Sequence, residues 1–318
     1  MANTESGSMK NKLVTLIGGG GFVGRYAVRA LLVAGARVRV AQRDPRHAWF
    51  LRTQGGLGQT QFVAADVTRP DTIARAVAGS DVVVNLVGAF GATMERVQVG
   101  GARVVAEAAA RAGAGALVHV SAIGADPAAA SNYGRTKGEG EAAVRDAFAT
   151  ATILRPSTVF GREDQFLNRF AGMIAALPVV PVLAAETRFQ PVFAGDVGEA
   201  IAVTAADPAS FGGRTLELGG PDVMTMMAIH RYLADEIDRS PSLVALPDIA
   251  GSLLASLPGA PISRDQWLML QQDNVVRGDD GFAALGIAPT PIAAVAPEWL
   301  VRFRKQGRFG RRSREQAA

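Results

Sequence analysis

Tyr133 and Lys137 are the two residues whose types and spacing most directly suggest chemistry. A separation of four positions places both side chains on one face of a helix. A neighbouring ammonium favours the phenolate form of a tyrosine, so such a pair can donate or accept a proton near neutral pH. The same spacing also occurs in ordinary surface pairs of helices, and the two residues alone leave both interpretations open.

A cluster of glycines supplies the second chemical signal. Gly18, Gly21 and Gly24 form a G-x-x-G-x-x-G spacing between an apolar run and an amphipathic stretch, and Gly20 permits another register. Small residues allow a tight turn and let backbone N–H groups approach a pyrophosphate, while the N-terminus of the following helix favours an anion. We therefore expect a dinucleotide-binding turn, and a flexible glycine loop is the alternative.

The tip of the second expected strand indicates which dinucleotide is bound. Gln42 and Arg43 stand where an acidic side chain would accept the ribose hydroxyls of NAD. A guanidinium can pair bidentately with a ribose 2′-phosphate, so the sequence favours NADPH over NADH. In the alternative interpretation, Arg43 is a solvated charge and Asp44 supplies the carboxylate that NADH requires.

Two further strand ends carry candidate cofactor residues. Asp66, with Val67 beside it, is placed to meet the adenine edge, and Val87 with Gly88 is placed to line the cofactor cleft. Each position also has a structural interpretation, with Asp66 as a turn or cap residue and Gly88 as a turn glycine.

Short β-branched runs alternate with longer alanine-rich stretches, which is typical of βαβ units around a parallel sheet. We expect an α/β fold, a Rossmann-type doubly wound parallel sheet with a smaller C-terminal α/β lobe. Near-continuous apolar runs indicate strands buried on both faces. They lie at Leu13–Ile17, Arg37–Ala41, Gln61–Ala64, Asp81–Val87, Ala116–Ser121 and Thr152–Leu154. Helices are expected at Phe22–Ala34, Arg69–Ala78, Met94–Ala112 and Tyr133–Phe148.

The expected domains are a disordered tail over residues 1–12, an NAD(P)-binding Rossmann domain over 13–240, and a C-terminal lobe with a basic tail over 241–318. Segments from residue 156 onward interleave with that lobe. Beyond this point we expect a strand at Arg214–Leu218 and helices at Val197–Ala206 and Met224–Ile237. Asp196 and Thr225 are the expected N-caps of the two helices, and the methionines at 224, 226 and 227 are expected core residues rather than ligands.

Composition argues against several classes of function. The chain of 318 residues is 48% hydrophobic and contains no cysteine, so a buried core is expected and disulfides are excluded. Three scattered histidines do not predict a metal site. No apolar stretch is long enough to span a bilayer, and the opening residues lack a secretory h-region, which favours a cytoplasmic protein.

The net positive charge of +4 is concentrated at the C-terminus. Residues 298–318 hold seven basic and two acidic side chains, which leaves a net charge of −1 on residues 1–297. Trp299 and Phe303 would share a helical face there, so we expect peripheral contact with an anionic membrane or an acidic protein surface. A disordered solubilising tail is the alternative. No nucleic-acid binding is expected, because no recognition module accompanies the charge.

These motifs together resemble the extended and atypical short-chain dehydrogenase/reductase superfamily over roughly residues 12–240. The residues that carry the resemblance are the glycine turn, Asp66, the Tyr133/Lys137 pair and Arg155-Pro156. Within the superfamily, the long segment Arg155–Asn168, followed by Phe189–Val192 and Asp196-Val197, resembles the family of the NADPH-binding accessory subunit of respiratory complex I (NADH:ubiquinone oxidoreductase).

The resemblance implies a tightly held NADPH, with NADH as the alternative cofactor. It implies that Phe22 and Val23 bind the phosphates together with the glycines and Arg43, and that Lys137 contacts the nicotinamide ribose. Residues implied beside the nicotinamide ring are Pro156, Ser157, Thr158 and Val159. The implied partners are peripheral-arm subunits of complex I, on the cytoplasmic face of the inner membrane. The accessory subunit that the chain resembles has no established catalytic turnover.

One departure from the family pattern bears on catalysis. Active members usually carry a serine or threonine just after the fifth strand to hold the substrate oxygen, and that position is Ile123 here. Ser121 lies two residues earlier, on the same side of an extended segment. We therefore expect a cofactor-binding structural or redox-sensing protein. The alternative is an NADPH-dependent oxidoreductase or epimerase that uses Tyr133, Lys137 and Ser121 on a quinone, isoprenoid or sugar-nucleotide carbonyl.

Overall fold

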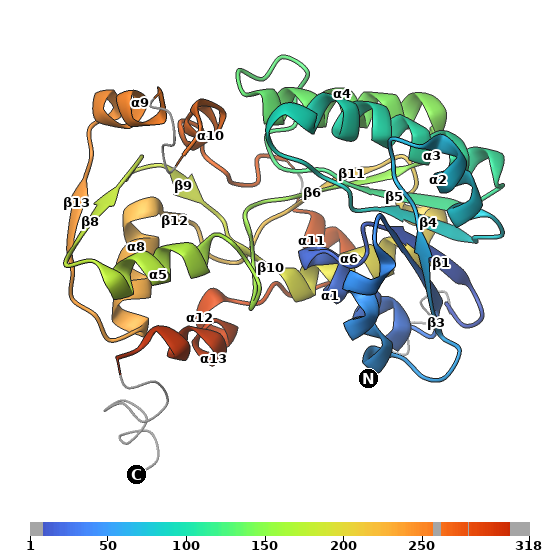
Figure 1. The fold of residues 1–318 in the computed structure, drawn as a ribbon, viewed down its shortest axis with the longest axis horizontal. Helices are drawn as coiled ribbons and strands as arrows, with labels where there is room; N and C mark the ends of the chain where they lie inside the picture. Colours follow the sequence, from blue (N-terminus) through green and yellow to red (C-terminus); the bar gives the residue numbers. More distant parts are fainter. Residues whose placement is uncertain (1–8, 257–261, 279, 306–318) are drawn as a thin grey trace, which may run out of the picture. The chain divides into compact units, whose positions relative to one another are not determined.

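The computed structural model describes residues 9–256, 262–278 and 280–305, and the chain divides into two compact units (Figure 1). Unit 1 consists of Met1–Pro156, Ala194–Leu218 and Val276–Ala288. Unit 2 consists of Ser157–Phe193, Gly219–Val275 and Pro289–Ala318. The chain therefore passes repeatedly from one unit to the other.

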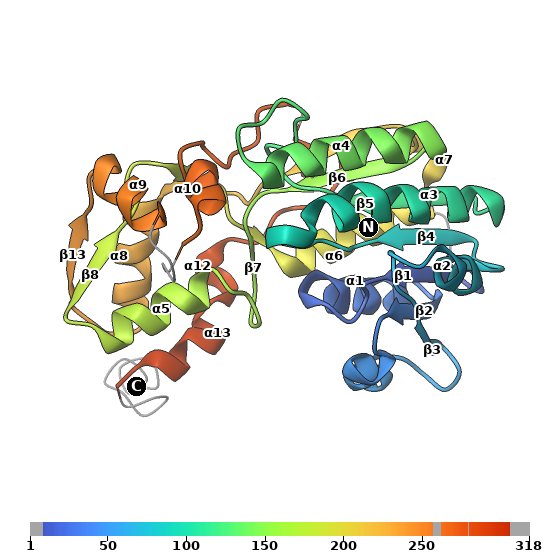
Figure 2. The same ribbon diagram turned by 45° about the horizontal axis from the view of Figure 1, so that its top comes forward.

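A seven-stranded sheet, parallel throughout, forms the centre of unit 1 (Figure 2). Its strand order is β11-β6-β5-β4-β1-β2-β3. The order reverses between β1 and β4, and ligands of open α/β sheets bind outside the carboxyl ends of the strands at such a point. The strands are β1 (Leu13–Ile17), β2 (Arg37–Gln42), β3 (Thr60–Ala64), β4 (Val82–Asn85), β5 (Ala116–Val120), β6 (Thr152–Pro156) and β11 (Thr215–Leu218). The expected α/β fold class is confirmed.

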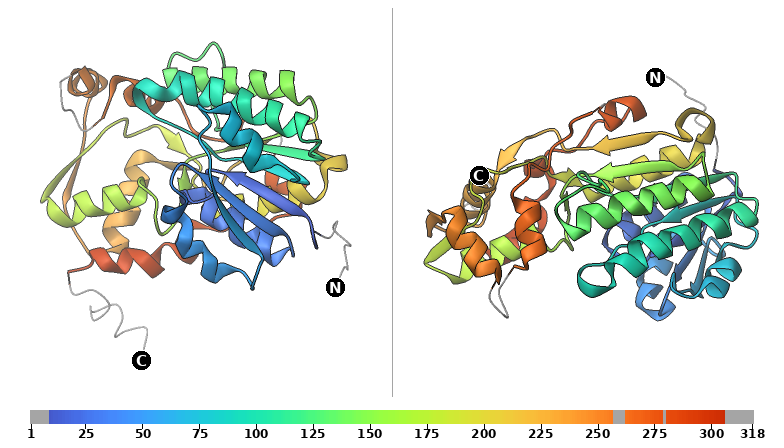
Figure 3. Two further views of the ribbon diagram at one scale, coloured as in Figure 1. Left: turned by 45° about the vertical axis from the view of Figure 1, so that its right-hand side comes forward. Right: turned by 90° about the horizontal axis from the view of Figure 1, so that it is seen from above.

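Helices cover both faces of this sheet (Figure 3). On one face α1 (Phe22–Val33) packs against α6 (Ala194–Ala206). On the other face α3 (Gly101–Arg111) lies between α2 (Pro70–Val77) and α4 (Asn132–Ala147). Small and β-branched side chains such as Val83, Val105 and Ala109 fill the layer between sheet and helices. This packing fixes the carboxyl ends of the strands, where the candidate site residues lie.

Three elements of the N-terminal half differ most from the sequence expectation. Strand β3 lies at one edge of the sheet and none of its residues is fully buried, so the expectation of burial on both faces is wrong there. Strand β4 ends at Asn85, two residues early, because Val87 N–H bonds the Asn85 side chain instead of a neighbouring strand. The expected helix Met94–Ala112 begins with a π-helical stretch, η3 (Glu95–Gly100), before α3.

Unit 1 also contains the short helices α7 (Pro208–Phe211) and α11 (Gly281–Leu285). The segment that carries α11 joins the sheet from far along the chain. Glu217 on β11 accepts hydrogen bonds from the backbone N–H groups of Arg277 (2.8 Å) and Gly278 (3.3 Å), and Phe282 is fully buried. A late segment of the chain thus closes the β11 edge of the sheet.

Unit 2 is a smaller α/β assembly with three two-stranded sheets. The pairs are β7 (Val159–Phe160) with β10 (Val192–Phe193), β8 (Val179–Val182) with β13 (Ser242–Ala245), and β9 (Arg188–Phe189) with β12 (Met224–Thr225). Its helices are α5 (Leu167–Ala176), α8 (Met226–Glu236), α9 (Asp248–Ser256), α10 (Arg264–Leu270), α12 (Ile292–Val295) and α13 (Pro297–Leu300). Phe160, Leu167, Ile229 and Leu300 belong to its core.

The expected helix caps have different outcomes. Thr225 caps α8 as predicted, because its hydroxyl accepts a hydrogen bond from Ala228 N–H at 3.1 Å. Asp196 is not an N-cap, since α6 already begins at Ala194 and Asp196 lies buried in its first turn. Met226 is buried in the core of unit 2, as expected of a core methionine.

The described ends of the chain are packed against the fold. Met9 is buried and Lys12 pairs with Asp81, while residues 1–8 of the expected tail lie outside the described residues. Trp299 is only 6% exposed and belongs to the core of unit 2, so the expected docking face formed by Trp299 and Phe303 is wrong. The basic residues beyond Lys305 lie outside the described residues. No helix in the described ranges has the length and apolar content to cross a membrane.

Candidate functional site

The glycine turn between β1 and α1 is held by its own backbone. Gly18 has a φ of +82°, its N–H donates to Ala41 O at 2.8 Å, and its carbonyl accepts from Gly21 N–H at 3.0 Å. A Cβ on Gly24 would collide with the carbonyl of Gly19, because α1 packs directly on the turn. Glycine is therefore required by backbone conformation at Gly18 and by close approach at Gly24.

The first turn of α1 is open to an anion. Its N-cap, Gly21, has no side chain to accept the unpaired N–H groups, and no acidic residue lies in the first turn, which starts with Phe22 and Val23. Gly21 is exposed while Phe22 and Val23 are half-buried. Uncapped N–H groups and the helix dipole favour a bound phosphate. The residues present thus fit the pyrophosphate of a dinucleotide.

Side chains at the tip of β2 have distinct partners. Gln42 lies over Gly20, where a Cβ would collide with its amide, and it donates to Asp44 O at 2.7 Å. Asp44 accepts from Arg46 N–H at 3.0 Å and pairs with the Arg46 guanidinium at 2.8 Å. Those bonds to Arg46 lower the pKa of Asp44 to about 2. Asp44 is thus already held by Arg46 and caps the 3₁₀ helix η1 (Pro45–Gln54).

Arg43 lies on the same tip and is exposed. Within the part of the chain that the structure describes, its guanidinium forms no hydrogen bond or ion pair. Its charge acts on Asp66, whose pKa is lowered chiefly by the Thr68 backbone N–H and further by Thr68 Oγ1 and Arg43. The β2 tip therefore presents an exposed guanidinium and a carboxylate that is already paired.

Asp66 and Val67, which follow β3, both make contacts that stabilise the fold. Asp66 accepts hydrogen bonds from Thr68 N–H (2.9 Å) and Thr68 Oγ1 (2.8 Å), which forms a turn before α2. Val67 is buried, and a Cβ on Gly101 would lie 2.7 Å from its Cγ2. The structural interpretation of Asp66 is confirmed, and its contact with an adenine stays a prediction.

The end of β4 joins the glycine turn to the helix α4. A Cβ on Gly18 would lie 3.2 Å from Val87 Cγ2, so these two residues are in contact. Gly88 is exposed, and a Cβ there would lie 3.8 Å from Lys137 Nζ. The structure thus brings Gly18, Val87, Gly88 and Lys137 together along the carboxyl edge of the sheet.

Lys137 is a buried ammonium, and only 5% of the residue is exposed. Its Nζ donates to Val120 O, at the end of β5, at 3.2 Å. Burial lowers the pKa of Lys137 to about 8, and the nearby Glu141 carboxylate opposes that shift. The lysine is therefore held with its charge at the junction of β5 and α4.

Tyr133 differs electrostatically from the sequence expectation. Lys137 Nζ lies 5.9 Å from the centre of the Tyr133 ring. Desolvation raises the pKa of Tyr133 to about 12, so the expectation that Lys137 lowers it is wrong in this structure. The apolar surroundings outweigh the distant ammonium, because they penalise the phenolate directly. Tyr133 is consequently a neutral hydrogen-bond donor at neutral pH.

Ser121 and Ile123 follow β5 with contrasting surroundings. Ser121 is 4% exposed, and its Oγ has no hydrogen-bond partner among the described residues. Ile123 is 8% exposed and is held through its backbone N–H, which donates to Pro156 O at 3.0 Å. A buried hydroxyl without a partner costs free energy, and at Ser121 a ligand oxygen could complete the hydrogen bonding.

The segment after β6 passes from one unit to the other. Pro156 ends β6 in unit 1, and Ser157, Thr158 and Val159 belong to unit 2. There Ser157 Oγ donates to Gln190 O, and Thr158 donates to Asn274 Oδ1 through both its N–H (2.6 Å) and its hydroxyl (2.9 Å). Their proximity to a nicotinamide ring stays a prediction.

Several residues near the site were missed by the sequence analysis. Asn85 Nδ2 lies 3.1 Å from His119 Nδ1, and burial lowers the pKa of His119 to about 3, so that the imidazole is neutral. Each of these two polar residues interrupts an otherwise apolar strand, β4 or β5, and that interruption is the sequence signal that could have identified them. Phe90 stacks on Tyr133 with ring centres 4.8 Å apart and planes 8° apart, and no local pattern marks it.

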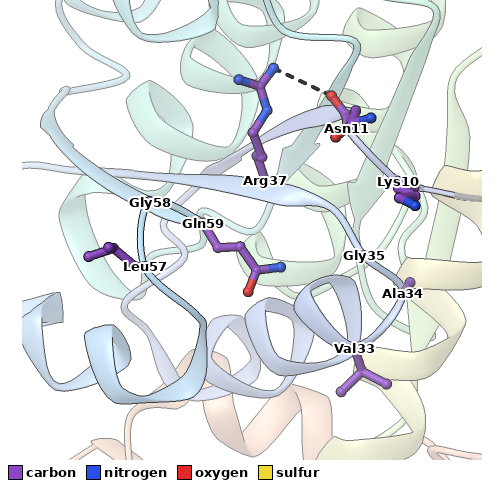
Figure 4. A pocket seen from close by; sticks show the side chains of 9 residues that line it. All are labelled: Lys10, Asn11, Val33, Ala34, Gly35, Arg37, Leu57, Gly58 and Gln59. Atoms are coloured by element: carbon purple, nitrogen blue, oxygen red, sulfur yellow. Dashed lines mark hydrogen bonds between the residues drawn. The ribbon is translucent and has the colours of Figure 1, made fainter.

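A separate hollow of about 580 Å³ lies at the opposite edge of the sheet (Figure 4). It is lined by residues from the segment before β1, the C-terminal end of α1 and the start of β2, including Lys10, Val33 and Arg37. These are the amino ends of the strands, whereas the glycine turn follows the carboxyl end of β1. The hollow is therefore not part of the candidate site.

Comparisons with known proteins agree with this geometry. The model of the NAD-dependent epimerase/dehydratase family matches residues 14–219. NADH dehydrogenase (ubiquinone) 1 alpha subcomplex subunit 9 of Mus musculus mitochondria is 34% identical, over 93% of this chain and 82% of its own length. A ceramide reductase of Caulobacter vibrioides is 33% identical, over 78% of this chain and 80% of its own. An NADPH-dependent quinone oxidoreductase of Escherichia coli, solved with NADPH, shares the fold with a TM-score of 0.73 at 18% identity, over 90% and 99% of the chains.

Proposed function

The chain belongs to the NAD-dependent epimerase/dehydratase family, and from this premise we propose that it holds NADPH and serves as an accessory protein of respiratory complex I. The observation that carries the proposal is the uncapped first turn of α1, after a glycine turn that contacts the tip of β2, where the Arg43 guanidinium is exposed. A dinucleotide pyrophosphate fits the N-terminus of α1, and a ribose 2′-phosphate fits the Arg43 guanidinium.

The accessory role rests on two further observations. The similar mouse protein is by name a subunit of NADH dehydrogenase, and Ile123 stands where active family members carry a hydroxyl. In this proposal the partners are peripheral-arm subunits of the complex at the cytoplasmic face of the inner membrane. The bound nucleotide then stabilises the fold or senses the NADPH pool.

Each cofactor contact in the proposal follows from a strand end. The pyrophosphate contacts are assigned to Gly18, Gly20, Gly21, Phe22, Val23 and Gly24. Asp66 and Val67 lie toward the adenine, and Val87 with Gly88 lines the cofactor between its two halves. Lys137 donates to the nicotinamide ribose. The nicotinamide ring is assigned to Pro156, Ser157, Thr158 and Val159.

The choice of NADPH is tested by measuring the affinities of NADPH and NADH for wild type, Arg43→Ala and Arg29→Ala. We expect Arg43→Ala to weaken NADPH binding roughly 10- to 100-fold and to leave NADH unchanged, because it removes one charged hydrogen-bonding partner. Arg29 is an exposed arginine on α1 and controls for net charge. Equal affinities of the wild type for the two nucleotides would contradict the proposal.

The accessory role is tested by native mass spectrometry of protein purified gently from its own cells. The expected spectrum contains NADPH at one per chain together with subunits of complex I. A chain that carries the nucleotide but co-purifies with none of those subunits would overturn the accessory role and leave the cofactor assignment standing.

An oxidoreductase is the second candidate function. It is favoured by the Ser121 hydroxyl, which has no hydrogen-bond partner in the described part of the chain. NADPH, when bound, would supply a hydride. Ser121 Oγ would then hold a substrate carbonyl oxygen, to which neutral Tyr133 donates its proton. The similar Caulobacter protein is by name a reductase. NADPH oxidation with a panel of carbonyl compounds, lost in Tyr133→Phe, is expected of an enzyme; no oxidation with any member of the panel would exclude this candidate for those compounds.

A further inference from the structure

Phe90 forms an apolar surface directly against the proton-donating residue of the candidate site. Its ring lies parallel to the Tyr133 ring, with centres 4.8 Å apart, and 64% of the residue is exposed. An exposed aromatic residue is common on protein surfaces. The parallel stack on Tyr133 is less common, and it places Phe90 where a ligand that approaches Tyr133 from that side also contacts Phe90.

The loop that carries Phe90 is anchored just before the ring. Gln98 is 3% exposed on η3, and its Nε2 donates to Ala89 O at 2.6 Å. The Oε1 of the same amide accepts from Thr136 Oγ1 at 2.8 Å, next to Lys137 on α4. After the ring, Gly91 turns the chain with a φ of +76°. The stack is thus tied by one buried amide to the helix that bears Tyr133.

The loops around this stack carry almost no charge. The segment 86–94 after β4 contains no charged residue, and the segment 121–131 after β5 contains Asp126 alone. Asp126 accepts from Ala128 N–H within its own turn at 2.8 Å. Within these two segments there is no cation for a substrate phosphate. Phe90 is the large hydrophobic side chain of these two segments that is exposed, whereas Ile123 is buried.

From these contacts we propose that Phe90 makes the site specific for carbonyl compounds with an apolar or aromatic group beside the carbonyl, and that it disfavours polyhydroxylated ones. The proposal rests on the proposed nucleotide site. An aromatic ring gains from stacking at Phe90, whereas a sugar would lose hydrogen bonds to water without regaining them there. The substrate or sensed ligand is therefore expected to be a ketone, aldehyde or quinone with an apolar body.

The test measures binding, so it does not depend on turnover. Calorimetric titration of the NADPH-saturated protein compares acetophenone with dihydroxyacetone in wild type, Phe90→Ala and Phe90→Tyr. We expect wild type to bind acetophenone more tightly, Phe90→Ala to weaken it about 3- to 10-fold, and Phe90→Tyr to restore it. Binding of dihydroxyacetone is expected to be the same in all three proteins.

NADPH affinity is measured first in the same three proteins, which separates the two proposals. Absence of NADPH binding in wild type would overturn the nucleotide site itself. Normal NADPH binding with acetophenone affinity that is absent, or indifferent to Phe90→Ala, would overturn the role of Phe90 alone. Tighter binding of dihydroxyacetone than of acetophenone would do the same.

Discussion

Lys137 carries a charge that the fold buries at a cost. Its ammonium is shielded from water and bonded to a single backbone carbonyl, Val120 O, with Glu141 as the nearby counter-charge. A protein keeps such a group when a ligand uses it, because burial of a charge without full pairing disfavours the folded state. The cost should therefore appear in the stability of the protein without nucleotide.

The pH dependence of stability isolates this cost. The folded pKa of Lys137, about 8, lies below its ordinary value of 10.5, so the unfolded state binds more protons between these two values. Stability attributable to Lys137 then rises from pH 8 to pH 10.5, on the order of 3 kcal/mol in total, and is constant below pH 8. Lys137→Met should abolish this rise in urea denaturation, whereas Lys305→Met, at an exposed position, should not. Parallel curves for wild type and Lys137→Met would contradict the assignment.

Single residues were predictable where their chemistry is local. The glycine turn, Arg43 and the Tyr133/Lys137 pair depend on neighbours within a few positions. The structure places the turn after β1, Arg43 after β2 and the pair in the first turns of α4. The direction of the Tyr133 pKa was not predictable, since it depends on burial that includes the stack with Phe90, 43 positions away. The burial of the Ser121 hydroxyl was not predictable either, because it depends on how the whole sheet packs.

Arg155 joins two elements of the site, β6 and α4. Its guanidinium donates to both oxygens of Glu141, at 2.9 Å and 2.6 Å, and Glu217 on β11 lies 3.9 Å from it. The Glu141 side chain is only 8% exposed. The pair therefore fixes α4, which carries Tyr133 and Lys137, against the strand that ends at Pro156.

Removal of one partner should be more costly than removal of both. Arg155→Met leaves a buried carboxylate unpaired and should destabilise the fold by about 3–5 kcal/mol. Arg155→Met combined with Glu141→Leu should recover part of that loss, because the double variant still lacks the Glu141 charge that offsets the buried Lys137 ammonium. Urea denaturation of the two single variants and the double variant provides a double-mutant cycle. Additive losses would show that the pair contributes no coupling between β6 and α4.

Elements were predictable where burial follows a regular period. Strands such as β1 and β5 are continuous apolar runs in the sheet interior, and their predicted bounds match closely. At the edge strand β3 the exposed residues Gln61 and Ala64 lie on opposite faces, so an apolar run did not imply burial there. The π-helix η3 at the start of the expected helix Met94–Ala112 was not predictable. No residue type in that stretch marks the wider turn of a π-helix.

At the scale of the molecule, the two units share one chain that crosses between them. A Rossmann unit that ends near residue 240 is what alternating strands and helices suggest, and nothing local marks Val276–Ala288 as part of the same sheet layer. Phe282 is nevertheless fully buried, and a Cβ on Gly281 would collide with Glu217 O. Val276–Ala288 belongs to unit 1 through contacts with residues far away in the sequence, so the sequence pattern did not reveal it.

A fragment of residues 13–240 tests this organisation directly. It lacks the backbone donors that satisfy Glu217 and the ring of Phe282 that packs in unit 1, and loss of a buried phenylalanine alone costs about 3–5 kcal/mol. That is a large share of the stability of an ordinary domain. We expect the fragment to show no cooperative unfolding transition and no NADPH binding, and Phe282→Ala in the full chain to unfold at lower urea than Phe90→Ala, whose ring is exposed. If the fragment unfolds cooperatively and binds NADPH as the full chain does, Val276–Ala288 is dispensable and unit 1 closes without it.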